Sequence, residues 1–418
     1  MSLLLDSEAN RRVVDGMRAI GIILVIFFHV VIGTVSLLAD DGVGRFVASF
    51  PDVFNFAWQA LGSEIIFLFS GFLLSYLLLR ELIHNGNIDI GNFYVRRLSR
   101  IVPLYMVGLL LYWLIRGYGR TELDDLVMNL LFISKLFGFT TIIPIGWSLE
   151  VLVQSYLLLP FLVLLLMRSG HPVKLVIVAL GAALAARYLQ LYLHPESYRI
   201  PPYAFLHGTE PPRSQHELYY QLYFRGTPFL LGFLLAYLVI FKDRLLRLTL
   251  GNGWSIWLFA VTSTVLVIAS GCLPIQDRYS PLYEYVSDGF WLWFWTLQRF
   301  VFAIGVCGLS LCAWYGRGWL VRALTWLLHL GLWKGISSHI YSIYLFHPLF
   351  LIPAAAIGFL TISKENIEPI RTVEILIIVA VAVVLSNLLG RVTTRFIEIP
   401  AQAKVRQKLE NIHWCVQA

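Results

Sequence analysis

The first apolar stretch of the chain carries two side chains that could do chemistry, Arg18 and His29. They lie in VVDGMRAIGIILVIFFHV, a run that begins at Val13 and also contains Asp15. On an α-helix, eleven residues make about three turns and rise about 16 Å, so the arginine and the histidine share one face at two depths. Such a face suits an extended ligand that passes through a helix bundle. The structural alternatives are an arginine that snorkels to the headgroups and a neutral histidine bonded to a neighbouring hydroxyl.

A second basic pair, Arg97 and Arg100, lies in the segment FYVRRLSRIVPLY. We expect this segment to form the inner loop before the third membrane span. On a helical turn, a spacing of three residues would place the two guanidinium groups side by side, as a fork that suits phosphates. The alternative is an anchor of the positive-inside kind, which multispan proteins commonly carry.

The segment IGWSLEVLVQSYLLLP brings a carboxylate, Glu150, to the start of a predicted helix. Trp147, Glu150 and Gln154 are three and four residues apart, so they share one helical face near the outer surface. A carboxylate and an imidazole at the same depth could form a base and its orienting partner, which acyl transfer to a hydroxyl requires. The alternative is an interfacial tryptophan beside a partly hydrated glutamate.

Four more ionisable side chains fall inside apolar runs, namely Glu64, Arg225, Arg299 and His347. Polar groups at membrane depth are costly, so each is a candidate functional residue, but any of them could instead tie helices together by hydrogen bonds. The positions of the four cysteines show no metal-ligand spacing, and we predict no metal site.

The composition places these residues in a membrane. Hydrophobic residues make up 58% of the chain and charged residues 14%, which is too apolar for a soluble domain. Apolar runs of about twenty residues recur, each long enough to cross a bilayer as a helix. We therefore predict an all-α integral membrane protein, with about ten transmembrane helices in one bundle. The predicted spans are Val13–Ser36, Val53–Leu79, Ile101–Arg116, Ile145–Met167, Val173–Tyr192, Tyr219–Phe241, Trp254–Cys272, Gly289–Trp314, Ser337–Leu360 and Thr372–Gly390.

The distribution of charge predicts the orientation. With the N-terminus inside, most of the 32 lysines and arginines fall on inner segments, and both termini are cytoplasmic. This requires Leu126–Ile143 to be an interfacial or re-entrant segment and not a further span. The first apolar run shows no signal-peptide cleavage site, so we expect it to remain as the first span. We divide the chain into one membrane domain, residues 1–400, and a basic cytoplasmic tail, residues 401–418.

Taken together, these segments resemble the membrane acyltransferase-3 family, bacterial enzymes that transfer acyl groups to extracytoplasmic sugars and polysaccharides. VDGMRAIGIILVIFFH resembles the family's arginine and histidine opening, FYVRRLSRIVPLY its RxxR motif, and FLFSGFLLSYLL, WSLEVLVQSYLLLP, FRGTPFLLGFLLAY, SHIYSIYLFHP and RFIEIP its later segments. The resemblance implies ten core helices, acyl-CoA supplied from the cytoplasm and an acceptor outside. It gives His29 the catalytic position, Arg18 the position of its basic partner, and Arg97 and Arg100 a role in binding the acyl donor.

One position departs from the family pattern. Many members carry a glutamate five residues after the tryptophan of WSL, where this chain has Leu152, and the nearby carboxylate is Glu150. The two positions differ by about 160° around a helix. Glu150 either fills the catalytic role from a shifted face or the carboxylate is not used.

We therefore expect an integral inner-membrane O-acyltransferase that moves an acyl group, with acetyl favoured, from cytoplasmic acyl-CoA to a hydroxyl of an extracytoplasmic polysaccharide or glycolipid. Membrane lipids surround it, nucleic acid is not an expected partner, and a periplasmic protein could assist delivery to the final acceptor. The alternatives are an exporter of a glycan or small anion, and a non-catalytic membrane subunit.

Overall fold

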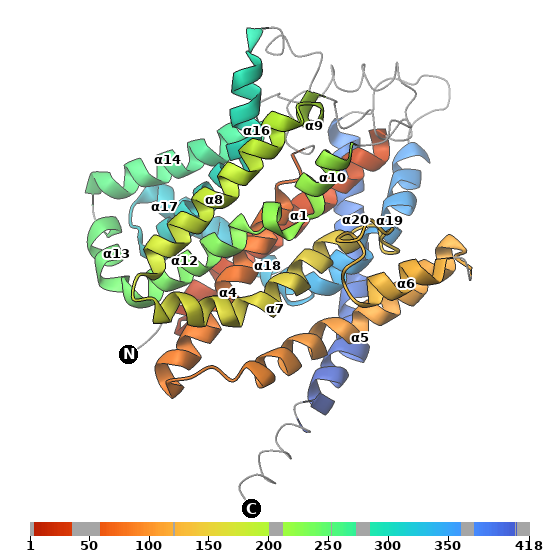
Figure 1. The fold of residues 1–418 in the computed structure, drawn as a ribbon, viewed down its shortest axis with the longest axis horizontal. Helices are drawn as coiled ribbons and strands as arrows, with labels where there is room; N and C mark the ends of the chain where they lie inside the picture. Colours follow the sequence, from red (N-terminus) through yellow and green to blue (C-terminus); the bar gives the residue numbers. More distant parts are fainter. Residues whose placement is uncertain are drawn as a thin grey trace, which may run out of the picture.

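The computed structural model describes residues 4–35, 59–119, 122–199, 212–251, 253–272, 285–360, 372–405 and 407. Within these ranges every regular element is a helix, which confirms the predicted all-α class (Figure 1). Eight of the described helices are long and apolar enough to cross a membrane. They are α1 (Glu8–Val35), α4 (Gly62–Asn85), α5 (Ile90–Arg116), α7 (Gly146–Arg168), α8 (Pro172–Leu193), α14 (Gly253–Cys272), α16 (Asp288–Tyr315) and α20 (Thr372–Thr393).

The remaining two predicted spans fall on α12 (Thr227–Phe241) and α19 (Ile340–Leu360), so the total of ten spans and the cytoplasmic placement of the termini stay predictions. Shorter elements join the long helices. These are η1 (Leu4–Asp6), α6 (Leu123–Leu130), α9 (Glu196–Arg199), α10 (Arg213–Tyr220), α11 (Leu222–Arg225), α13 (Asp243–Leu250), α17 (Trp319–Leu328), α18 (Gly331–Ser338) and the π-helix η4 (Thr394–Glu398).

Helix α1 lies inside the bundle, where it contacts α4, α18, α19 and α20 (Figure 1). The most extensive helix pair is α4 with α12, and two glycines permit it. A Cβ on Gly232 would lie 2.4 Å from the carbonyl oxygen of Leu68, and one on Gly71 would lie 2.8 Å from the backbone of Phe229. Such close backbone approach through small residues is typical of membrane helices, because lipid offers no hydrophobic drive for association.

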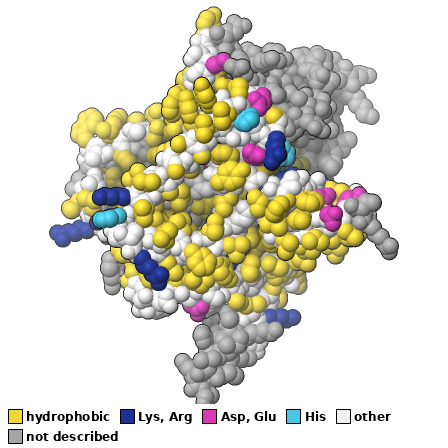
Figure 2. All heavy atoms as spheres, in the orientation of Figure 1, with side chains coloured by type: hydrophobic (Ala, Val, Ile, Leu, Met, Phe, Trp, Pro, Cys, Tyr) yellow, Lys and Arg dark blue, Asp and Glu magenta, His cyan; other side chains and the backbone are white. Residues whose placement is uncertain are grey.

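Apolar side chains cover the central part of the outer surface of the bundle. Figure 2 shows one face on which hydrophobic side chains cover the centre and charged side chains lie mostly toward the edges. Large apolar side chains on α5, α7 and α8 point outward, among them Leu114, Leu165 and Val178, each at least 65% exposed. An apolar belt of this extent is a lipid-facing surface in a multi-pass membrane protein.

Three predicted boundaries are wrong. FYVRRLSRIVPLY is not a loop but part of α5, which begins at Ile90 because Asp89 caps it by accepting a hydrogen bond from the backbone N–H of Asn92 (2.9 Å). The span expected from Tyr219 is broken at Gln221, whose extended backbone separates α10 from α11, and helix α12 begins only at Thr227. The second span begins as a helix at Gly62, and residues 53–58 lie outside the described ranges.

The segment Leu126–Ile143 does not form a spanning helix. It completes the eight-residue α6 and continues as turns. The buried side chain of Asn129 holds these turns together: its Nδ2 donates to the carbonyls of Asp125 and Thr140 (both 2.7 Å), and its Oδ1 accepts from the N–H of Ile142 (3.1 Å). The backbone is therefore satisfied internally, as a non-helical segment at membrane depth requires.

Candidate active site

Three arginines and a group of aromatic and hydroxyl side chains line a cavity of about 100 Å³ between α1, α4, α5, α7 and α19. The arginines are Arg18 of α1 and Arg97 and Arg100 of α5, and we call them the cavity arginines. None of the described residues that line the cavity is acidic. The three predicted donor-binding residues are thus brought together, although α1 and α5 are far apart in the sequence. A cavity with this lining would attract a multiply charged anion.

Hydrogen bonds fix the position of Arg18. Its Nη1 donates to the hydroxyl of Ser337 (3.2 Å), and this hydroxyl donates to Oδ1 of Asp15 (2.7 Å). Asp15, a predicted candidate, is therefore a link between α1 and α18 that orients Arg18 through Ser337. Arg97 packs its guanidinium over Phe93 (5.9 Å to the ring centroid), and its buried Nε has no hydrogen-bond partner among the described residues.

The cavity extends along α4 from Ile66 to Leu74 and reaches Ser148 and Tyr344, whose hydroxyls share a hydrogen bond. His347, one turn after Tyr344 on α19, packs behind that tyrosine with 5.9 Å between ring centroids. His29 of α1 lies against His347, with 4.9 Å between ring centroids. Neither histidine is among the lining residues, and Tyr344 is the lining residue with a described contact to the histidine pair.

The hydrogen bonds of the two histidines assign their tautomers. Nδ1 of His29 lies 2.8 Å from the carbonyl of Val25 and Nδ1 of His347 lies 2.8 Å from the carbonyl of Tyr344. A carbonyl can only accept, so both Nδ1 atoms carry the proton. Nε2 of His347, 3.3 Å from Nδ1 of His29, is then an acceptor for the same N–H. Nε2 of His29 has no hydrogen-bond partner among the described residues, so its lone pair could act as a general base.

Glu150 does not join this histidine pair. It is buried and accepts hydrogen bonds from the hydroxyl of Ser134 and from the N–H of Lys135 (2.9 Å), which anchors the non-helical segment after α6 to α7. Leu152, at the position where many relatives carry the carboxylate, lines the cavity. The structure therefore gives His29 a histidine as its orienting partner, where the sequence suggested a glutamate.

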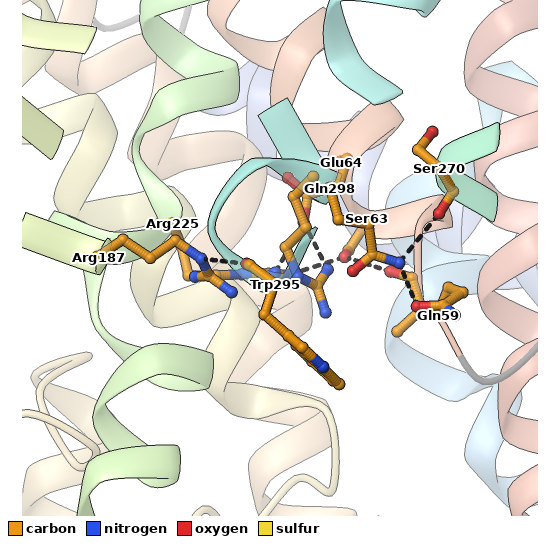
Figure 3. A network of polar contacts seen from close by, with 10 residues as sticks. Gln59, Ser63, Glu64, Arg187, Arg225, Ser270, Trp295 and Gln298 are labelled. Carbon is orange, nitrogen blue, oxygen red and sulfur yellow. Dashed lines mark hydrogen bonds and ion pairs between the residues drawn. The ribbon is translucent and has the colours of Figure 1, made fainter. Parts of the chain in front are cut away.

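Glu64, Arg225 and Arg299 form a second, largely buried group, and Arg187 of α8 lines a small cavity with Glu64 and Arg299. Figure 3 shows Glu64, Arg225 and Arg187. Oε1 of Glu64 lies 2.7 Å from Nη1 of Arg225 and 2.7 Å from Nη1 of Arg299. The Arg225 guanidinium also stacks against Trp147 (5.2 Å), Phe67 and Tyr219. These contacts tie α4, α7, α11 and α16 together, in accordance with the helix-linking alternative for Glu64 and Arg225. Trp147 is likewise part of this packing.

Sequence reasoning missed several of these residues. Arg187 lies within a predicted span and was not singled out, although an arginine in an apolar run is itself a signal. Ser148 and Tyr344 lie within the motifs WSLE and SIYLFHP, but a hydroxyl group in an apolar segment does not by itself indicate a role. Among the described residues, no group of three or more histidine, cysteine, aspartate or glutamate side chains could hold a metal ion.

Comparison with known proteins identifies the kind of chain. A family model described as an acyltransferase domain matches residues 11–391. Peptidoglycan O-acetyltransferase OatA of Listeria monocytogenes is 24% identical over 245 residues, which are 54% of this chain and 33% of that protein. O-acetyltransferase OatA of Staphylococcus aureus is 26% identical over 199 residues, which are 43% of this chain and 29% of that protein. No solved structure matches the chain.

The aligned region thus spans a third or less of the length of each relative. The family match, by contrast, covers nearly all of this chain and includes the cavity, the histidine pair and the arginine–glutamate group. The chain therefore belongs to the membrane acyltransferase-3 family, as its motifs predict.

Proposed function

We propose that this protein is an acyl-CoA-dependent O-acyltransferase of the bacterial inner membrane. It transfers an acyl group, acetyl in the first instance, from the cytoplasmic donor to a hydroxyl of an extracytoplasmic carbohydrate. The observation that carries the proposal is the cavity itself. Three arginines line it with no acidic residue among the described lining residues, and Tyr344, which also lines it, contacts His347 of the histidine pair.

The cavity arginines suit the phosphates of a coenzyme A donor. Arginines at membrane depth normally pair with carboxylates or carbonyls, and an unpaired buried guanidinium nitrogen is costly. The buried Nε of Arg97 and the absence of acids among the described lining residues are features that a phosphate ligand would satisfy. The rise of about 16 Å from Arg18 to His29 is similar to the length of a pantetheine arm, so the thioester would reach the histidine pair.

The free Nε2 of His29 supports a general-base role. In the proposed step, Nε2 takes the proton of the acceptor hydroxyl while the hydroxyl oxygen attacks the thioester carbonyl carbon. The carbon–sulfur bond then breaks, and the departing thiolate takes the proton back from the imidazolium. His347 would stabilise that imidazolium by accepting the Nδ1 hydrogen bond, so it serves as a positioning residue.

The acceptor is proposed from the relatives. Two proteins that align with this chain are named O-acetyltransferases, and the one from Listeria is named for peptidoglycan. A peptidoglycan-like carbohydrate or its lipid-linked precursor is therefore the acceptor class that we propose. The aligned part of each relative is a third or less of that protein, so a separate periplasmic partner could assist delivery here.

The test is acetyl-CoA binding and thioester turnover by purified protein in detergent. We expect the native chain to bind acetyl-CoA, and His29→Ala to retain binding while turnover falls about 10²- to 10⁴-fold, the usual contribution of a general base. His339→Ala is the matched control, because His339 is a half-buried histidine that bonds only nearby groups of its own segment, Gly335 and Ser338. If the folded native protein failed to bind acetyl-CoA, acyl-CoA would not be the donor, and an exporter or subunit role would be favoured. Full turnover in His29→Ala would show that His29 is not the general base.

A further inference from the structure

The buried group around Glu64 contains more positive charge than its described carboxylate can balance. Arg187, Arg225 and Arg299, which we call the cluster arginines, contribute three guanidinium groups. Glu64 pairs with Arg225 and Arg299, and it lines the same small cavity as Arg187. Arg187 and Arg225 are 7% and 1% exposed, and Glu64 is 1% exposed. Buried charges without compensation are strongly unfavourable at low dielectric, so the excess calls for an anion.

Unpaired donors point to where the anion would lie. Arg187 donates its Nε hydrogen bond to the carbonyl of Trp295 (3.0 Å), while its buried Nη1 has no hydrogen-bond partner among the described residues (Figure 3). The buried Nε of Arg225 also has no partner among the described residues, but Arg225 is not one of the described residues that line the cavity beside Arg187. Leaving a buried charged donor unsatisfied costs more than an ordinary lost hydrogen bond, because the desolvation penalty is paid in full.

A small cavity lies at this place. Arg187, Arg299, Glu64 and the hydroxyl-bearing residues Thr227 and Thr296 line a space of about 10 Å³, bounded also by Phe224 and Phe300. That volume holds about one water-sized sphere. It is too small for a phosphate or a sugar carboxylate, but a single atom with one negative charge fits it.

We infer that this cavity is a binding site for one halide-sized anion, chloride under physiological conditions. Guanidinium N–H groups of Arg187 and Arg299 and the hydroxyl of Thr227 supply its donors. One bound chloride would halve the excess charge of the cluster. Because Arg225 bonds the same carboxylate and stacks beneath Trp147 at the start of α7, the anion would also stabilise the arrangement of α4, α7, α8 and α16.

The experiment measures the thermal unfolding midpoint of the purified protein in detergent while sodium gluconate is replaced by sodium chloride at constant ionic strength. We expect a saturable rise of a few degrees with chloride and with bromide, because a ligand that binds the folded state raises its stability by mass action. A chloride-independent midpoint would overturn the site and leave a water in the cavity. An unsaturable rise would equally overturn it, as a general salt effect.

Variants locate the effect. Arg187→Gln removes a donor and one positive charge, and should abolish the chloride response. Thr227→Val removes a hydroxyl with little change in size, and should weaken the response several-fold even if Arg187→Gln cannot be purified. Arg213→Gln is the matched control, because the Arg213 side chain is 93% exposed and pairs with Glu217, and its chloride response should equal that of the native chain. A native response in both Arg187→Gln and Thr227→Val would place the anion elsewhere and refute the inference.

Discussion

Two groups of three arginines lie among the helices of the bundle, and their surroundings differ. The cavity arginines, Arg18, Arg97 and Arg100, face about 100 Å³ of space with no acidic lining residue among those described. Of the cluster arginines, Arg225 and Arg299 pair with Glu64, while Arg187 lines with Glu64 and Arg299 a space of about 10 Å³. Aromatic rings cover the cluster, whereas the cavity is lined in addition by Ser70 and by hydroxyl groups of tyrosines.

The contrast shows what distinguishes a ligand site from a structural site made of the same residue type. A guanidinium that is tied to a carboxylate and stacked between rings links helices and leaves no room for a substrate. A guanidinium that faces open space without a carboxylate is poised for a charged ligand. Residue identity alone does not separate the two groups, since each consists of arginines in apolar surroundings.

The largest effect should come from removing the carboxylate of the cluster. Glu64→Ala would leave three buried guanidinium groups without their described counter-charge, and breaking a buried pair in this way costs about 3–5 kcal/mol. We expect little folded protein in the membrane and a steep loss of thermal stability in detergent. Both can be measured by quantifying extracted protein and its unfolding midpoint.

The exposed pair Arg213–Glu217 provides the control for this change. Its arginine side chain is 93% exposed, so Arg213→Gln should alter stability by less than about 1 kcal/mol. If Glu64→Ala folded as well as the native chain, the cluster would not be a structural group, and the contrast with the cavity would lose its basis.

Substitution of the cavity arginines should have a smaller effect than Glu64→Ala. It should weaken ligand binding and leave folding intact. Arg97→Gln with Arg100→Gln removes charged hydrogen bonds to the donor. Loss of even one such bond, worth about 1.5–3 kcal/mol, lowers affinity about 13- to 160-fold, so we expect affinity for acetyl-CoA to fall at least about tenfold. The unfolding midpoint without ligand should be unchanged or higher, because Arg97 already has a buried unpaired nitrogen.

Equilibrium binding of acetyl-CoA and thermal unfolding in the same detergent separate these readouts. Arg168→Gln is the matched control, since Arg168 is an exposed arginine at the end of α7 and lines neither site. Unfolding of the double variant with no selective loss of binding would make the cavity arginines structural, like those of the cluster.

Local periodicity accounts for what the sequence predicted of these sites. The eleven-residue spacing places Arg18 and His29 on one face, and in the structure they contact Ser337 and His347 of the continuous α18–α19 stretch. The three-residue spacing of Arg97 and Arg100 likewise brings both into one cavity. These relations depend on the geometry of a single helix, which the apolar pattern reveals.

Partners on different helices could not be predicted in the same way. The packing and rotation of the helices decide these partners. They determine that Glu150 bonds Ser134 and not a histidine, and that Arg225 pairs with Glu64 and not with a ligand. Contacts such as His29 with His347 join residues 318 positions apart. The apolar pattern of a membrane span marks it as a helix but fixes its rotation weakly, because both lipid and core are apolar.

The smallest effect should come from His347, the histidine that contacts His29 and Tyr344. His347→Asn removes the acceptor that Nε2 provides to His29, but Nδ1 of His29 keeps its hydrogen bond to the Val25 carbonyl, so its free Nε2 is retained. The bond is neutral in the ground state and charge-assisted once His29 is an imidazolium, a gain of about 1–1.5 kcal/mol, so its loss corresponds to a roughly 5- to 13-fold lower turnover at unchanged acetyl-CoA affinity. Steady-state kinetics with separate kcat and KM would show this, and His339→Asn should leave both values native. A loss as large as that of His29→Ala would mean that His347 itself touches the reacting atoms, and the catalytic centre would then extend past Tyr344 toward the arginine cluster.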